Sequence, residues 1–173
     1  MSRRPLVLFA AVALGCYLLD LATKALAVAK LGEDPVQVIG SLLQLHLVRN
    51  PGAAFSTGTS YTIVLSCIAI VAVCTVLWYS RRLRSPMWAI GLGALLGGVL
   101  GNLTDRVFRE PGFLRGHVVD FFQVPHWPVF NVADICINVA AAVIILQAVR
   151  GVGIDGRRHR AAGDPGADSN AEA

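Results

Sequence analysis

The chain has 173 residues, of which 55% are hydrophobic and 15% charged, and its mean hydropathy is +0.61. Soluble domains ordinarily carry about 25% charged residues, so the composition argues against a soluble protein and against disorder over most of the chain. The net charge of +4 could indicate a nucleic-acid partner. The positions of the basic residues along the chain matter more for this question than their sum.

Four segments are apolar enough to span a membrane, which takes about 20 residues in a helix. The predicted helices cover residues 5–29, 61–79, 85–104 and 130–149. The first contains Asp20 and Lys24, the fourth contains Asp134, and the other two carry no charge. We therefore predict an all-α membrane protein with four transmembrane helices, in which residues 1–150 form one intramembrane domain.

The N-terminus also has features of a cleavable secretory signal, with Arg3 and Arg4 followed by an apolar run and small residues before Cys16. The apolar pattern, however, continues past Cys16 as far as Ala29, which is not how a cleaved signal is built. Retention as the first transmembrane helix is the favoured interpretation.

The segments between the helices are predicted to form little regular structure apart from strands. Residues 43–48 alternate between apolar and polar types, which predicts a strand, and Asn50-Pro51-Gly52 predicts a turn. We expect a small extracytoplasmic β-rich segment between the first two helices. Residues 151–173 are rich in Gly, Ala, Asp and Arg and are predicted to form a disordered cytoplasmic tail.

The distribution of Lys and Arg predicts the orientation. Four crossings place both termini and the loop at residues 80–86 on one side, with nine basic residues: Arg3, Arg4, Arg81, Arg82, Arg84, Arg150, Arg157, Arg158 and Arg160. The other side has five: Lys30, Arg49, Arg106, Arg109 and Arg115. The positive-inside rule then makes the termini cytoplasmic. The topology explains the net charge, so we expect no nucleic-acid partner.

The cysteines, histidines and clustered glycines of the sequence indicate no metal or cofactor site. The four cysteines lie in apolar runs without a CxxC pair, and the four histidines are scattered without metal-ligand spacing, so no metal site is predicted. Five glycines fall inside the predicted third helix and are better explained by close helix packing than by a phosphate-binding loop. They are Gly91, Gly93, Gly97, Gly98 and Gly101.

The predicted topology brings the membrane-embedded polar residues to one level, near the outer interface. They are Asp20 and Lys24 on the first helix, Asn102, Asp105 and Arg106 on the third, Asn131 and Asp134 on the fourth, and Asp120 on the preceding outer segment. Ionisable groups at such depth are costly and are functional candidates by default. Simple structural alternatives remain for two groups, because Asp20 with Lys24 and Asp105 with Arg106 can form ion pairs that only brace the helices.

Asp120 and Asp134 differ from these because each is flanked by apolar residues and lacks an adjacent cation. Two such carboxyl groups are expected to have raised pKa values and to share a proton. This is the arrangement of an aspartic protease, in which one carboxylate activates water while the protonated partner polarises the scissile carbonyl. Two unrelated carboxylates that reach toward the interface are the alternative.

Five blocks carry a resemblance to a known family. They are residues 20–24, 50–55, 98–106, 116–121 and 130–134, and they occur in the expected order between Leu6 and Val149. In these blocks the sequence resembles the bacterial lipoprotein signal peptidase (signal peptidase II) family.

The resemblance implies an intramembrane aspartic endopeptidase of the bacterial cytoplasmic membrane that needs no metal or cofactor. It implies cleavage of prolipoproteins just before a cysteine that carries diacylglyceryl, with the site near the outer leaflet, and inhibition by globomycin. The catalytic pair of the family falls on Asp120 and Asp134. Its supporting or substrate-binding residues fall on Asp20, Asn50, Asn102, Asp105, Arg106 and Asn131.

Two other classes of protein remain as alternatives from the residues alone. Buried Asp and Lys also mark ion pathways, so a small transporter or proton-relay protein is the main alternative. A structural membrane protein whose charges pair for assembly is the other.

Overall fold

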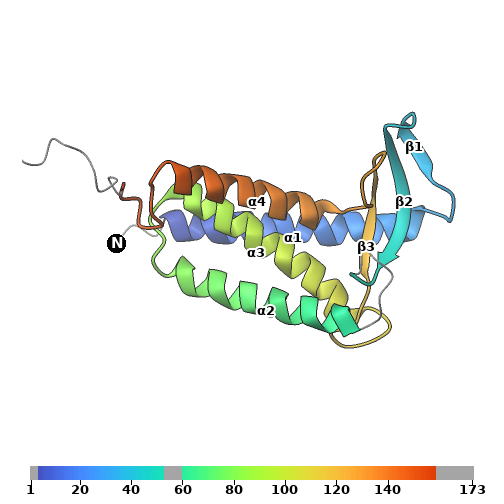
Figure 1. Cartoon of the computed structure of the whole chain (residues 1–173), viewed down its shortest axis with the longest axis horizontal. Helices are drawn as coiled ribbons and strands as arrows, with labels where there is room; N and C mark the ends of the chain where they lie inside the picture. Colours follow the sequence, from blue (N-terminus) through green and yellow to red (C-terminus); the bar gives the residue numbers. More distant parts are fainter. Residues whose placement is uncertain (1–3, 53–59, 159–173) are drawn as a thin grey trace, which may run out of the picture.

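A computed structural model describes residues 4–52 and 60–158 of the chain. It contains the four predicted helices, α1 (Arg4–Lys30), α2 (Ser60–Ser80), α3 (Pro86–Phe108) and α4 (Val132–Val149). Each is long and apolar enough to cross a membrane. They lie side by side as a bundle, and α1 begins at the same end at which α4 ends (Figure 1). The prediction of a four-helix membrane protein is confirmed.

A small sheet covers the other end of the bundle (Figure 1). Strands β1 (Val36–Ile39) and β2 (Leu43–Asn50) come from between α1 and α2, as predicted, and β3 (Val118–Gln123) comes from between α3 and α4. The order is β1-β2-β3, with both neighbouring pairs antiparallel. The prediction placed strands only between the first two helices, and it did not include β3 or its long-range pairing with β2.

Two helix boundaries differ from the prediction by more than one residue. Helix α3 continues to Phe108, four residues beyond the predicted end at residue 104, because Asp105 pairs with partners inside the protein instead of facing water. Helix α4 begins at Val132 instead of residue 130, because Asn131 is extended (φ −132°) and caps the helix with its side chain. Phe130 belongs to the sheet, where it pairs with Phe122.

Helix α3 is the central helix and contacts each of the other three. Its glycines face two neighbours. A Cβ at Gly97 would lie 2.5 Å from the Ala13 carbonyl oxygen of α1, and one at Gly98 would lie 2.6 Å from the Ala133 carbonyl oxygen of α4. Both distances are too short for any side chain, so the glycines allow close helix packing, as the sequence predicts.

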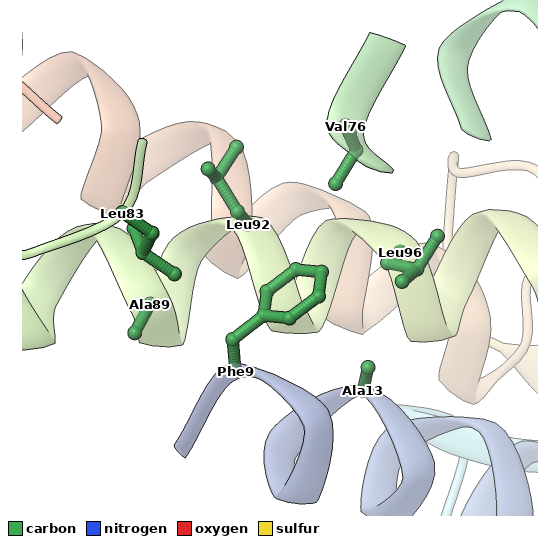
Figure 2. Close-up of a cluster of buried hydrophobic side chains, with 7 residues drawn as sticks. All are labelled: Phe9, Ala13, Val76, Leu83, Ala89, Leu92 and Leu96. Atoms are coloured by element: carbon green, nitrogen blue, oxygen red, sulfur yellow. The ribbon is translucent and has the colours of Figure 1, made fainter. Parts of the chain in front are cut away.

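The apolar interior lies mainly along α3. One cluster comprises Phe9, Ala13, Val76, Leu83, Ala89, Leu92 and Leu96. Figure 2 shows Phe9 and Ala13 on α1 pointing toward Leu92 and Leu96 on α3, with Val76 of α2 on the far side. A second cluster lies where β3 meets the bundle and contains Ala27, Val119, Phe121 and Val132. It fixes β3 against the ends of α1 and α4.

Residues 151–158, the first part of the predicted tail, form defined backbone contacts after α4. Val152 pairs with Arg158, and the Ile154 carbonyl oxygen accepts hydrogen bonds from the backbone of Arg84 and Ser85. The Trp88 indole donates to the Val152 carbonyl oxygen at 2.8 Å. These backbone contacts compensate for the low apolar content. Residues 159–173 of the predicted tail lie outside the described part.

The close contact between α1 and α3 predicts different effects of alanine at two glycines. Gly97→Ala should lower the free energy of unfolding by about 1–3 kcal/mol, because the new methyl group forces α1 away from α3. Gly15→Ala is the control, since Gly15 lies on the exposed side of α1 with no atom near its Cβ position. That variant should be as stable as the wild type or slightly more stable. Thermal unfolding in detergent micelles measures both, and equal stability of the two variants would contradict the packing argument.

Candidate active site

Polar side chains from five elements meet where the sheet covers the bundle. The structure brings together seven of the eight predicted site residues in one hydrogen-bonded network: Asp20, Asn50, Asn102, Asp105, Asp120, Asn131 and Asp134. Asp20, Asp105, Asp120 and Asn131 are almost completely buried. The network therefore lies in the interior, at the level of the helix ends nearest the sheet.

Lys24 holds one half of the network together. Its Nζ lies 2.7 Å from Asp20 Oδ2 and 2.9 Å from Asp105 Oδ2, and it donates a 2.9 Å hydrogen bond to Asn102 Oδ1. Lys24 is fully buried. The i, i+4 spacing predicts its pair with Asp20, which is confirmed, but local spacing gives no sign of its contacts with α3.

Asp105 differs from the prediction in its partner. It pairs with Lys24 and, through its other oxygen, with Arg109 Nε, whereas the sequence suggested the adjacent Arg106. Consecutive helical residues do not face each other, while residues four apart do. Asp105 also accepts a hydrogen bond from the Val119 backbone N–H at 3.2 Å, which ties α3 to β3.

The N-terminus of α4 is fixed from two sides. Asp20 Oδ1 accepts a 2.9 Å hydrogen bond from the Ala133 N–H, so a carboxylate of α1 satisfies a free donor of α4. Asn131 and Asp134 form a reciprocal capping box, in which each side chain accepts from the other residue's backbone N–H at 3.0 and 3.1 Å. Negative charge at this end is favoured by the helix dipole. Asp134 is thereby held in a defined orientation.

The two carboxyl groups of Asp120 and Asp134 are linked by neutral amides. Asn131 Nδ2 donates to Asp120 Oδ1 at 2.6 Å and to Asn102 Oδ1 at 3.0 Å, and Asn102 Nδ2 donates to Asp134 Oδ1 at 2.9 Å. Asn50 Nδ2 donates to Asp120 Oδ2 at 2.9 Å. Each of the four carboxyl oxygens thus accepts one hydrogen bond, which orients both groups while adding no charge.

Asp120 is the ionisable group of the site that lies on the sheet. Its position is set by the strand pairing, in which Val48 of β2 lies opposite Asp120, and Asn50 follows two residues later along β2. Burial raises the pKa of Asp120 from 3.8 to about 6, and the charge of Asp134 acts in the same direction, against the hydrogen bonds from Asn50 and Asn131. Asp120 can therefore exchange a proton near neutral pH.

Both carboxyl groups line one cavity of about 480 Å³. Its other lining residues are Asn50, Trp127, Pro128, Val129, Phe130, Ile135, Asn138 and Val139. Ile135 and Val139 are 43% and 50% exposed on the outer surface of α4. The cavity thus joins the pair of carboxyl groups to an apolar surface that faces the lipid in a membrane.

Arg106 lies beside this network, next to the turn after β2. Gly52 has a φ of +93°, and a Cβ there would come within 2.9 Å of Arg106 Nη2 and 2.6 Å of Leu65 Cδ1. Arg106 Nη1 is buried without a hydrogen-bond partner in residues 4–52 and 60–158. Glycine at position 52 therefore lets the turn approach the guanidinium. The rest of this sequence block, residues 53–55, lies outside the described part.

Comparison with known proteins gives consistent results. The sequence model of the family described as "Signal peptidase (SPase) II" matches residues 12–150. A lipoprotein signal peptidase of Leifsonia xyli subsp. xyli (strain CTCB07) is 53% identical, over 90% of this chain and 73% of that protein. One of Mycobacterium avium (strain 104) is 50% identical, over 91% of this chain and 88% of that protein.

The fold is similar to that of a solved bacterial membrane enzyme. That structure, obtained by the in meso method at 1.9 Å resolution, aligns with a TM-score of 0.72 at 24% identity. The alignment covers 81% of this chain and 91% of the other. The likeness supports the same arrangement of helices and sheet.

The buried cluster around Lys24 predicts a large effect of removing its charge. Lys24→Met should lower the free energy of unfolding by about 3–5 kcal/mol, because Asp20 and Asp105 would lose their shared cation in the interior. Lys30→Met is the matched control on the same helix, since Lys30 is exposed, and it should change stability by less than about 0.5 kcal/mol. Unfolding in detergent micelles measures both. A Lys24→Met protein as stable as Lys30→Met would show that the cluster does not support the fold.

Proposed function

The chain belongs to the signal peptidase II family, and we propose that it removes signal peptides from lipoprotein precursors by an aspartic mechanism with Asp120 and Asp134 as the catalytic pair. The observation that carries this proposal is that both carboxyl groups line one cavity and are oriented by shared neutral donors. The family is a family of peptidases, and this chain is a multi-pass membrane protein. The catalytic type and the site residues are our inference.

The proposed reaction uses water and the two carboxyl groups. One carboxylate takes a proton from water, whose oxygen attacks the scissile carbonyl carbon, while the protonated partner donates to the carbonyl oxygen. In the resulting intermediate, the carboxyl group that took the proton from water donates it to the peptide nitrogen and the C–N bond breaks. The hydroxyl formed at the carbonyl oxygen returns its proton to the other carboxylate as the C=O bond re-forms. No cofactor takes part in these steps. The raised pKa of Asp120, about 6, supports a pair that holds a single proton near neutral pH.

The remaining polar residues have supporting roles in this proposal. Asn50, Asn102 and Asn131 orient the catalytic carboxyl groups through their hydrogen bonds. Asp20 and Asp105, with Lys24, fix the helix ends that carry these amides. Arg106, beside the turn at Gly52, is assigned to substrate binding in this proposal. These residues are positioning or substrate-binding groups.

The cavity also supports a lipid-modified substrate. It opens beside Ile135 and Val139 on the outer surface of α4, where acyl chains in the bilayer can lie while the peptide reaches the carboxyl groups. We propose cleavage just before a diacylglyceryl-modified cysteine, and inhibition by globomycin at the same cavity.

The distribution of basic residues supports an orientation for this site. The excess of Arg at the end of the bundle opposite the sheet favours cytoplasmic termini in the bacterial cytoplasmic membrane. The active site then lies near the outer leaflet, at the depth where the modified cysteine rests.

The two-carboxylate mechanism predicts that neither acid can be replaced by its amide. Asp120→Asn and Asp134→Asn should each reduce turnover by at least about a thousandfold, since general acid–base catalysis alone contributes factors of this order. Asp155→Asn is the control, because Asp155 lies at the other end of the bundle, and it should retain full activity. The mass shift of a diacylglyceryl-modified prolipoprotein incubated with purified protein measures turnover, and unchanged thermal unfolding shows that the variants are folded. Normal cleavage by either amide variant would exclude this mechanism, whereas no cleavage by the wild type would favour a transporter or a scaffold.

The position of the cavity predicts that the lipid determines substrate recognition. Each buried CH₂ contributes about 0.8 kcal/mol to membrane binding, so the acyl chains hold the scissile bond at the correct depth. The same precursor without diacylglyceryl should be cleaved much more slowly. Rates are to be compared in proteoliposomes at equal membrane-bound concentrations of the two precursors. Equal rates would show that the enzyme does not depend on the lipid.

A further inference from the structure

A basic cavity lies at the end of the bundle opposite the candidate active site. It has a volume of about 570 Å³ and is lined by Pro5, Leu83, Asp155 and four arginines, Arg81, Arg82, Arg84 and Arg157. Three arginines come from the loop between α2 and α3, and the fourth comes from the segment after α4. Four cations therefore face a common space with a single carboxylate.

The walls of this cavity are held by specific contacts. The Arg84 and Ser85 N–H groups donate to the Ile154 carbonyl oxygen at 3.0 and 3.2 Å, and the Gly153 N–H donates to the Arg157 carbonyl oxygen at 2.8 Å. Ser85 also caps α3. These hydrogen bonds hold residues 151–158 against the α2–α3 loop. The backbone of this segment therefore fixes Arg157 near the other three arginines.

The arginine charges are only weakly compensated within the described residues. Among the residues that line the cavity, the structure shows one ion pair, between Arg157 Nε and Asp155 Oδ2 at 3.7 Å, with the Arg157 side chain 79% exposed. Arg81 lies over the Trp78 ring with its guanidinium carbon 5.6 Å from the ring centre, which leaves its N–H donors available. Arginine donors of this kind match phosphate oxygens in geometry and charge.

The surroundings of the cavity indicate the source of the phosphate. Arg81 directly follows α2 and Arg84 directly precedes the capping residue of α3, so the cavity lies at the membrane interface if the helices span the bilayer. Exposed apolar side chains lie next to lining residues: Leu6 and Val7 follow Pro5 in the chain, and Trp78 lies against Arg81. A lipid can place its headgroup among the arginines and its acyl chains along these residues, whereas a free phosphate would use only the arginines.

We propose that this cavity binds the phosphate of an anionic phospholipid headgroup. Basic pockets at the cytoplasmic ends of transmembrane helices are suited to such headgroups. The site is separate from the peptidase site and does not depend on the catalytic assignment. It would hold the α2–α3 loop and the segment after α4 against the inner leaflet.

The test measures lipid binding to the full chain in detergent by native mass spectrometry, with phosphatidylglycerol as the anionic lipid and phosphatidylcholine as the neutral one. The wild type should bind phosphatidylglycerol more tightly. The double variant Arg81→Gln/Arg84→Gln should bind it about tenfold or more weakly, because each basic residue near an anionic surface contributes about fivefold. Should this variant misfold, Arg157→Gln alone should still weaken binding about fivefold.

The matched control is Arg150→Gln/Arg158→Gln, which removes two exposed arginines from the same end of the bundle that do not line the cavity. It should leave the affinity within about twofold of the wild type, and all variants should keep peptidase activity in phosphatidylcholine. Equal weakening by the two double variants would show diffuse surface attraction and overturn the proposal. Displacement of the lipid by glycerol 1-phosphate at similar concentration would also overturn it, by showing a site for a free phosphate.

Discussion

Lys24 carries a full positive charge in the interior of the protein, and the geometry of the candidate active site depends on how that charge is compensated. Its contacts with Asp20, Asp105 and Asn102 join α1 to α3. Removing a single member would leave a buried charge without a partner, which is far more costly than losing a surface ion pair. The cluster therefore fixes the relative positions of the helix ends on which the site is built.

Neutral groups connect this cluster to the proposed catalytic pair, Asp120 and Asp134. Asn102 accepts from Lys24 and donates to Asp134, while Asp20 holds the start of α4 through Ala133. The four aspartates thus divide into two kinds by environment. Asp20 and Asp105 have a cation and serve the structure, whereas Asp120 and Asp134 are bound by amides. Among the described residues neither Asp120 nor Asp134 has a cation at ion-pair distance, although Arg106 and Lys24 act on Asp120 from farther away. A cation in direct contact would favour the ionised form of both carboxylates, and the proposed mechanism requires one of them to carry a proton.

The sequence predicts the helices well because apolar length alone determines which segments can span a bilayer. It also predicts that the polar residues gather at one end, since that follows from the number and direction of the crossings. The sequence does not predict which of these polar residues contact one another. The contact of Lys24 with Asp105 and the pairing of β3 with β2 join residues far apart in the chain, and no local period encodes them. The predicted end of α3 is four residues too early for the same reason, because a carboxylate after an apolar run indicates a polar boundary unless its buried partners are known.

Burial of Asp120 has an energetic consequence for the whole fold. Its pKa is about 6 in the folded protein and 3.8 ordinarily, so the folded state binds a proton more tightly than the unfolded state. This contribution to stability is fully present below pH 3.8 and is lost as the pH rises through about 6. At neutral pH the loss is on the order of 3 kcal/mol, since each unit of pKa difference is worth about 1.4 kcal/mol. A buried carboxyl group with these properties lowers the stability of the protein at neutral pH, and the contacts that offset this loss must lie elsewhere. The charge cluster at Lys24 and the glycine-mediated packing of α1 on α3 can supply this stability without an ion pair at Asp120.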